Sequence, residues 1–385
     1  MTVTGPKGFR AAGVAAGIKQ DALDLALVVN DGPEQTAAGV FTRNMIKAAP
    51  VLWTEEVLRH QRLKAVVLNS GGANAATGPG GFQDTHATAE KVAEVLGSGA
   101  IDVAVCSTGL IGERLPMPAV LSGVESAARA LATGPEAGLA AATAIMTTDS
   151  KPKQALRSHE AGWSVGGCAK GAGMLAPNLA TMLSVLTTDA VVEPDALDAA
   201  LRAAARVTFD RLDVDGGTST NDTVLVLSSG ASGIAPRVDE FTDVLTRTCL
   251  DLVLQLRADA EGATKDVDLI VRGAASEQDA INVGRTVAED NLVKTALFGS
   301  DPNWGRIAMA VGRSRAEVDP GSLSITINGV PVFAQGLPGE DRAKADLTGR
   351  AIEIVIDLGV GSSETTIYTT DLSHAYVEEN SAYSS

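Results

Sequence analysis

Short apolar runs alternate with helical patterns along almost the whole chain. Continuous or alternating apolar runs predict strands, and apolar residues at helical spacing predict helices. Strands are predicted at 65–69, 103–106, 182–186, 223–227, 268–271, 323–327, 352–356 and 366–376. Helices are predicted at 85–96, 119–131, 136–145, 194–209, 238–260 and 277–297. This alternation predicts a mixed α/β fold in which helices cover the faces of layered sheets.

The pattern indicates a single unit. No internal repeat, low-complexity tract or linker interrupts it, so residues 1–385 are expected to form one compact body. The short polar tail at 377–385 is expected to fray on physical grounds alone, because it offers little apolar surface to bury.

Composition is that of an ordinary soluble globular protein. Hydrophobic residues make up 45% and charged residues 20%, while aromatic residues are only 3%, so Ala, Val, Leu and Ile must build the core. The net charge of −16 argues against a nucleic-acid partner. No apolar run reaches the roughly 18 residues that span a bilayer, and the N-terminal stretch does not resemble a signal peptide. A cytoplasmic protein without a membrane partner is expected.

The three cysteines, Cys106, Cys168 and Cys249, are widely spaced and odd in number. They match neither a metal-binding spacing nor a disulfide framework. We therefore expect them to be buried small residues in a reducing compartment, and we expect no metal site.

The glycine-rich stretch KGAGMLAPNLATML at 170–183 carries the most informative chemistry. Thr181 stands where this loop meets a predicted strand, so a strained backbone would let its hydroxyl attack the preceding carbonyl. Cleavage would give Thr181 a free α-amine that serves as base for its own hydroxyl, with no need for a histidine. The alternative is that Thr181 has only a structural role, as a β-branched residue that begins a strand after a glycine turn.

Several motifs occur in the same order as in a known protein family. They are AGVFTRN at 38–44, NSGGANA at 69–75, CSTGLIG at 106–112, IMTTD at 145–149, the loop at 170–183, DGGTSTND at 215–222, ADAEG at 258–262 and GSDPNWGR at 299–306. Together they resemble the ornithine acetyltransferase family, the glutamate N-acetyltransferases of arginine biosynthesis.

The resemblance implies a fold and a reaction. The fold is an α-β-β-α sandwich similar to amino-terminal-nucleophile hydrolases but with different connectivity. The precursor would cut itself between Ala180 and Thr181, and the fragments 1–180 and 181–385 would stay together in an α2β2 heterotetramer. Thr181 would take acetyl from N2-acetylornithine and pass it to glutamate. No cofactor is implied, and whether acetyl-CoA also serves as donor stays open.

The same resemblance assigns further residues. Thr108 and Gly109 correspond to an oxyanion hole, where donors would meet the charge that develops on the attacked carbonyl. The substrate-binding positions are Thr147, Lys170, Thr181, Glu261, Asn380 and Ser385. We expect Lys170 to pair with a substrate carboxylate and Glu261 to pair with the ornithine ammonium.

Each assignment has an ordinary alternative. A Ser-Thr-Gly turn is commonly structural, and a lone Lys170 or Glu261 is commonly a solvated surface charge. The stretch 301–306 would either shape the pocket wall or end the preceding helix. Two other functions also stay open: a self-processing amidase or aminopeptidase in which water accepts the acyl group, and a non-catalytic binding protein that uses its glycine loops as an anion nest.

Overall fold

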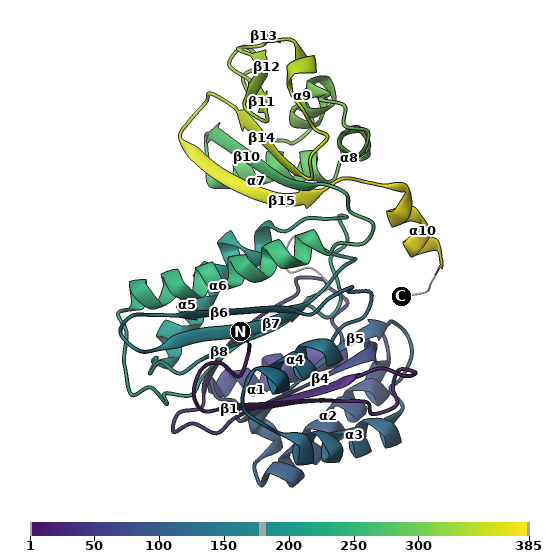
Figure 1. Cartoon of the computed structure of the whole chain (residues 1–385), viewed down its shortest axis with the longest axis vertical. Coiled ribbons are helices and arrows are strands. Elements are labelled where there is room, and N and C mark those ends of the chain that lie inside the picture. The colour runs from purple at the N-terminus through teal and green to yellow at the C-terminus, as the bar shows by residue number, and fades with distance from the viewer. Residues whose placement is uncertain (1, 177–181, 383–385) are drawn as a thin grey trace.

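A computed structural model describes residues 2–176 and 182–382. Its strands form three sheets (Figure 1). The first has the order β1-β2-β4-β5 and contains β1 (Phe9–Val14), β2 (Leu25–Asn30), β4 (Ala65–Gly72) and β5 (Val103–Leu110). The second has the order β3-β9-β8-β7-β6 and contains β3 (Thr36–Phe41), β6 (Lys153–Ser158), β7 (Ser164–Lys170), β8 (Leu183–Thr188) and β9 (Thr223–Ser228).

The third sheet and the helices complete the described chain. The sheet runs β13-β12-β11-β14-β10-β15, with β10 (Asp266–Ala274), β11 (Ser324–Ile327), β12 (Val330–Ala334), β13 (Leu337–Pro338), β14 (Ala351–Asp357) and β15 (Ser363–Thr370). The α-helices are α1 (Ala49–Val57), α2 (Gly78–Leu96), α3 (Met117–Ala130), α4 (Pro135–Ala144), α5 (Pro194–Val207), α6 (Val238–Ala258), α7 (Glu277–Ala288), α8 (Asn291–Phe298), α9 (Trp304–Gly312) and α10 (His374–Ala382). Short 3-10 turns lie at Leu58–His60, Ala100–Asp102, Phe209–Arg211 and Arg342–Lys344.

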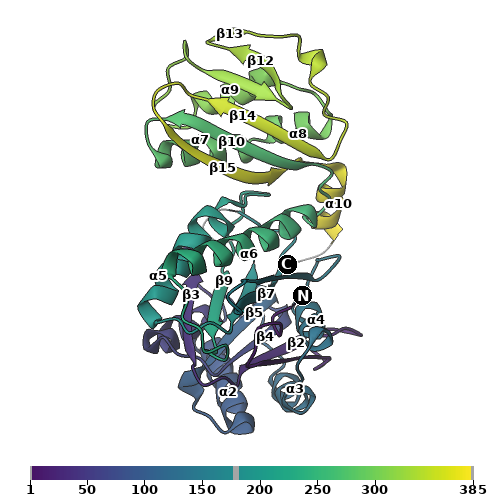
Figure 2. The same ribbon diagram turned by 60° about the vertical axis from the view of Figure 1, so that its left-hand side comes forward.

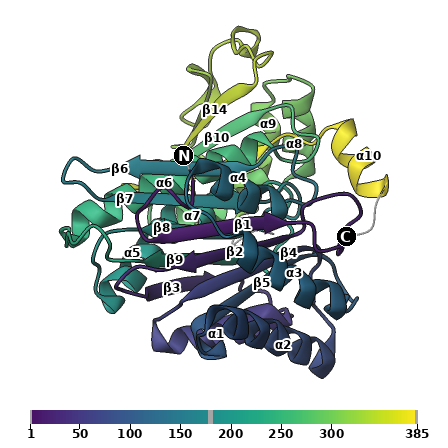
Figure 3. The same cartoon turned by 60° about the horizontal axis from the view of Figure 1, so that its bottom comes forward.

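The first two sheets pack face to face through a shared apolar core. Phe9, Val28 and Leu68 of the first sheet meet Val185 and Leu225 of the second in this layer. Helices α2 and α3 cover the outer face of the first sheet, and α5 and α6 cover the outer face of the second. Helices α1 and α2 lie side by side (Figure 3). The sequence of layers is the expected α-β-β-α sandwich, so that prediction of the fold is confirmed.

The second sheet interleaves segments from both sides of residues 177–181. Its central strands β8 and β9 come from after this stretch, and they lie between β3 on one side and β7 and β6 on the other, all from before it. Leu183 of β8 pairs with Lys170 of β7, and Leu183 also pairs with Thr223 of β9. Both parts of the chain are therefore needed to complete this sheet.

The third sheet has its own apolar core under α7, α8 and α9 (Figure 2). After β15 the chain turns back, and α10 descends from the third sheet toward the sandwich (Figure 1). The hydroxyl of Ser373 accepts a hydrogen bond from the Tyr376 N–H at 3.1 Å, in the first turn of this helix.

Two predicted elements were wrong in their extent. The strand predicted at 366–376 ends at Thr370, and its last residues belong to α10 instead. The helix predicted at 277–297 is broken, because the carboxylate of Asp290 accepts hydrogen bonds from the N–H groups of Leu292 and Val293 and so starts a new helix. The other predicted elements are present, with ends shifted by a few residues; α2 starts earlier, at Gly78.

Candidate active site

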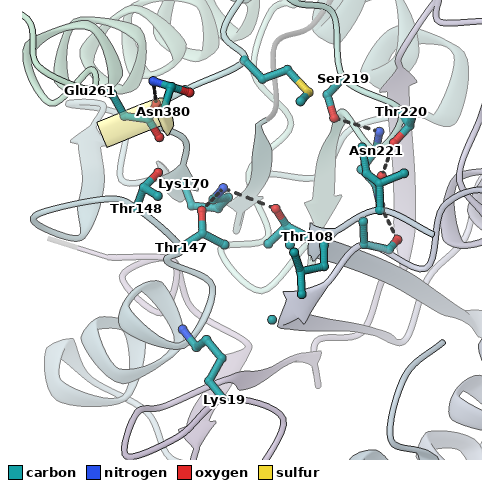
Figure 4. A pocket seen from close by; sticks show the side chains of 17 residues that line it. Lys19, Thr108, Thr147, Thr148, Lys170, Ser219, Thr220, Asn221, Glu261 and Asn380 are labelled. Carbon is teal, nitrogen blue, oxygen red and sulfur yellow. Dashed lines mark hydrogen bonds between the residues drawn. The ribbon is translucent and has the colours of Figure 1, made fainter. Parts of the chain in front are cut away.

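A cavity of about 260 Å³ opens at one end of the sandwich (Figure 4). The carboxyl ends of β4, β5 and β7 meet there with the loop that precedes β9 and with residues that follow α6. The lining residues are Lys19, Gly71, Ala73, Thr108, Gly109, Leu110, Ile111, Thr147, Thr148, Lys170, Gly173, Met174, Ser219, Thr220, Asn221, Glu261 and Asn380. Six of the residues singled out from the sequence therefore share one cavity.

Thr108 and Gly109 stand at the end of β5, where β5 runs parallel to β4 and Gly109 pairs with Gly71. Gly109 has φ +130°, and a Cβ there would lie 2.5 Å from backbone atoms of Gly71 and Gly72. Only glycine lets the two backbones approach this closely. Backbone atoms of Gly71 and Gly109 therefore form the cavity wall next to the Thr108 side chain.

Lys170 ends β7 and is buried, with only 2% of its surface exposed. Its ammonium donates to the hydroxyl of Thr147 at 2.7 Å and to that of Thr108 at 3.3 Å. Burial lowers the pKa of Lys170, while the carboxylate of Asp149, 3.9 Å away, acts in the opposite direction. The reading of Lys170 as a solvated surface charge is thus wrong.

Asp149 organises the cations behind the cavity wall, a role that the sequence patterns did not reveal. Its carboxylate accepts from the Thr147 N–H at 3.0 Å and the Gly171 N–H at 2.7 Å, and it forms an ion pair with the fully buried Lys153. Burial acts to raise the pKa of Asp149, but Lys170, Lys153 and the Gly171 N–H outweigh it, so the pKa is lowered. Asp149 therefore fixes the backbone that carries Thr147. The only sequence feature that could have pointed to Asp149 is its position in the motif at 145–149.

Glu261 and Asn380 come together from distant parts of the chain. The Glu261 N–H donates to the Ala172 carbonyl at 3.0 Å, and the Asn380 amide donates to the Glu261 carboxylate at 2.8 Å. Glu261 is 5% exposed, so the solvated reading is wrong for it too. The tail that was expected to fray is helical through Ala382, and it brings Asn380 to the cavity.

Met182, the first described residue after 177–181, lies directly before β8 and is held by a buried carboxylate. The Met182 N–H donates to the Asp222 carboxylate at 3.1 Å. Asp222 is fully buried, and burial raises its pKa well above the usual value although the Met182 N–H and Lys170 act to lower it. Asn221 beside it donates to the carbonyls of Ala73 and Ser107. Asn221 lines the cavity and was not singled out, although it lies in the motif at 215–222.

Three of the predicted residues, Ala180, Thr181 and Ser385, lie outside the described residues. The stretch 301–306 connects α8 to α9, where Asn303 caps α9, and none of its residues lines the cavity. The stretch therefore has a structural role and is not part of the pocket wall. It follows α8, as expected, and it also starts α9.

All three cysteines lie in the interior of the molecule. Cys106, Cys168 and Cys249 are free and buried, as expected, and burial raises the pKa of Cys106 to about 12. Within 2–176 and 182–382, no cluster of three or more His, Cys, Asp or Glu is arranged to hold a metal ion. In the same part of the chain, no helix combines the length and apolar character needed to cross a membrane.

Comparison with known proteins gives the family. The ArgJ family profile matches residues 10–385. A protein of Mycolicibacterium paratuberculosis named "Arginine biosynthesis bifunctional protein ArgJ" is 60% identical over 389 residues, covering 100% of this chain and 96% of the relative. A protein of the same name from Mycobacterium tuberculosis is 61% identical with the same coverage.

A solved structure is also similar: ornithine acetyltransferase from Mycobacterium tuberculosis, complexed with ornithine. The sequences are 64% identical, the match covers 46% of this chain and 94% of the solved chain, and the TM-score is 0.45. The match of the family profile to nearly the whole chain and the identity to full-length relatives agree with the motifs. The chain therefore belongs to the ArgJ family of arginine-biosynthesis enzymes, and its resemblance to the ornithine acetyltransferases is confirmed.

Proposed function

We propose that this chain transfers acetyl from N2-acetylornithine to glutamate through an acetyl ester on Thr181. The observation that carries the proposal is the convergence of Thr108, Gly109, Lys170 and Glu261 on one cavity. A further support is the position of the neighbours of Thr181 in the sequence: Met182 bonds to Asp222, and Leu183 pairs with Lys170.

The first chemical step frees the nucleophile. The Thr181 hydroxyl attacks the carbonyl carbon of Ala180, and the peptide C–N bond breaks to give an ester and a free Thr181 α-amine. Water then hydrolyses the ester and leaves Ala180 as a carboxylate. An α-amine has a pKa of about 7.7–8.0, so a useful fraction is unprotonated near neutral pH and can act as base.

Acetyl transfer then takes two further steps. The Thr181 hydroxyl gives its proton to the α-amine and attacks the acetyl carbonyl of N2-acetylornithine. The negative charge on that oxygen is met by the Thr108 hydroxyl and the Gly109 N–H, and ornithine leaves after its amine takes up the proton. The amine of glutamate attacks the acetyl ester, which releases N-acetylglutamate and restores Thr181.

Substrate recognition follows from the charges in the cavity. Lys170 pairs with the carboxylate of the substrate, Glu261 pairs with the ornithine ammonium, and Thr147, Asn380 and Ser385 complete the contacts. Undiminished substrate affinity in Lys170→Ala would refute the first role. An unchanged preference for ornithine over other amines in Glu261→Gln would refute the second.

The name "bifunctional" of the relatives favours a second donor. We accordingly propose acetyl-CoA as an alternative acetyl source for glutamate, without a resident cofactor. We also propose that the two fragments assemble as an α2β2 heterotetramer in the cytoplasm.

Mass spectrometry of the purified protein tests the cleavage. Two fragments, with threonine first in the second, are expected, whereas a single fully active chain of 39.3 kDa would overturn the mechanism. Acetate and N-acetylglutamate are then measured from N2-acetylornithine, with and without glutamate. Rapid acetate release that glutamate does not suppress would favour the amidase or aminopeptidase function instead. Substituting acetyl-CoA for N2-acetylornithine tests the second donor.

A further inference from the structure

Lys19 lines the cavity, although none of the family motifs contains it. It lies on the loop between β1 and β2, and its ammonium donates to the Met146 carbonyl at 2.8 Å. Met146 directly precedes Thr147, so the ammonium stands at the edge of the proposed substrate site. Figure 4 shows Lys19 and Glu261 on opposite sides of Thr147 and Lys170.

The loop that carries Lys19 is held rigidly by a buried carboxylate. Asp24, with no exposed surface, accepts hydrogen bonds from the N–H groups of Ala16, Gly17, Ile18 and Lys19 at 2.6–3.1 Å. Such a cluster of backbone donors around one carboxylate fixes the path of the loop. Lys19 is therefore presented to the cavity by a preorganised support.

The aliphatic stem of Lys19 is also fixed in place. A Cβ on Gly71 would lie 2.8 Å from Cγ of Lys19, so the stem packs directly on the backbone of β4. Gly71 is the strand partner of Gly109 and lines the same cavity. The side chain is thus directed along the cavity wall.

The carboxylates near Lys19 already have other partners. Asp24 is occupied by the four backbone donors, and Asp149 by Lys153 and two N–H groups. Among the residues that the structure describes, the ammonium of Lys19 forms no ion pair and donates to a neutral carbonyl. Burial lowers the pKa of Lys19, while the charges of Asp24 and Asp149 act in the opposite direction, as an incoming carboxylate would.

The two substrates of the proposed reaction differ in the sign of their side-chain charge. Ornithine ends in an ammonium that suits Glu261, whereas the γ-carboxylate of glutamate would be repelled there. A site that accepts both substrates in turn needs a separate cation for the second carboxylate. Lys170 is assigned to the carboxylate that both substrates share.

We propose that Lys19 forms a carboxylate subsite that binds the γ-carboxylate of the acceptor glutamate. This inference rests on the proposed function. It means that the side chains of donor and acceptor extend toward opposite ends of the cavity, one to Glu261 and the other to Lys19. Lys19 then sets the choice of acceptor without taking part in the first half of the reaction.

The sharpest test is Lys19→Gln, because glutamine can still donate to the Met146 carbonyl while the positive charge is lost. Acetyl transfer from N2-acetylornithine is measured with glutamate and with glutamine as acceptor. The wild type should prefer glutamate, and the variant should lower the ratio of the two kcat/KM values by about tenfold or more, equivalent to about 1.4 kcal/mol. Lys19→Arg should keep the preference, and in Lys19→Gln the pre-steady-state release of ornithine should change much less than acetyl transfer to glutamate does.

The matched control is Lys64→Gln, since Lys64 also donates to a backbone carbonyl, that of Asn30, but does not line the cavity. It should leave the acceptor ratio unchanged. Equal losses with both acceptors in Lys19→Gln would show that Lys19 only supports the backbone, and an unchanged ratio would also overturn the subsite. If Lys19→Gln fails to fold, Lys19→Met takes its place with the same criteria. A wild type that forms no N-acetylglutamate would refute the proposed function itself.

Discussion

Adding a methyl group at Gly109 should lower the rate of catalysis by more than the loss of stability alone explains. In Gly109→Ala the new Cβ would lie 2.5 Å from backbone atoms of Gly71 and Gly72. The ends of β4 and β5 must then move apart by about 0.9 Å, the difference from the 3.4 Å at which ordinary contact begins. That shift moves the Gly109 N–H away from the proposed oxyanion. Losing one such donor typically costs about 2.7–4 kcal/mol, so kcat should fall by about 10²–10³.

Gly112→Ala is the matched control. Gly112 also has a positive φ, +88°, but nothing lies within 4 Å of its Cβ position, and it does not line the cavity. Both variants carry the backbone penalty of alanine in a left-handed conformation, about 1–2 kcal/mol, which thermal unfolding will report. Only Gly109→Ala should also slow ornithine release from N2-acetylornithine, measured per cleaved chain. Rates for the two variants within about threefold of each other would refute the reasoning.

Further predictions concern the buried charges. Lys153→Met should lower the free energy of unfolding in urea by about 3–5 kcal/mol, because Asp149 loses the nearer of its two lysine partners and Asp259 loses the same ammonium; a loss below about 1 kcal/mol, as for surface pairs, would contradict this. Asn380→Ala should raise KM for N2-acetylornithine about tenfold or more, since it removes the 2.8 Å bond to Glu261; an unchanged KM would exclude that role. Burial lowers the pKa of Lys294 from 10.5 to about 8. Between these pH values the unfolded chain binds more protons than the folded one, so stability should rise with pH. Urea titrations at several pH values should show wild type gaining stability relative to Lys294→Met across this window, and a constant difference would argue against it.

The sequence predicted most strands made of large apolar residues, although it missed β2 (LALVVN), and it missed several strands made of small residues. The Val- and Leu-rich strands β4, β5, β8 and β9 were found, whereas β1, β3 and β7, rich in Ala and Gly, were not. Their small residues are required by close packing: a Cβ at Gly13 of β1 would lie 2.0 Å from the Ala140 carbonyl oxygen of α4. A strand chosen for such contacts resembles a loop when it is read by itself.

Much of the candidate site was predictable through the ordered motifs, and the rest depended on tertiary structure. Thr108, Gly109 and Lys170 lie in or beside recognisable glycine turns, so their patterns could be matched. Lys153 and Lys19 carry no local signal, because a lysine in a sequence looks the same whether it will be buried or solvated. Their importance arises only when the fold brings Asp149 and the Met146 carbonyl to them.

The alternation of segments in the second sheet has a consequence for the proposed cleavage. If the bond before Thr181 is severed, the two products remain woven through one another, since β8 and β9 lie between β3 and β7. Neither piece can complete the second sheet by itself, so separately expressed halves should not yield native protein. Cleaved molecules should likewise not exchange their two fragments. Mixing two isotopically distinct preparations should give no molecules that combine fragments from both, unless the proteins are first denatured.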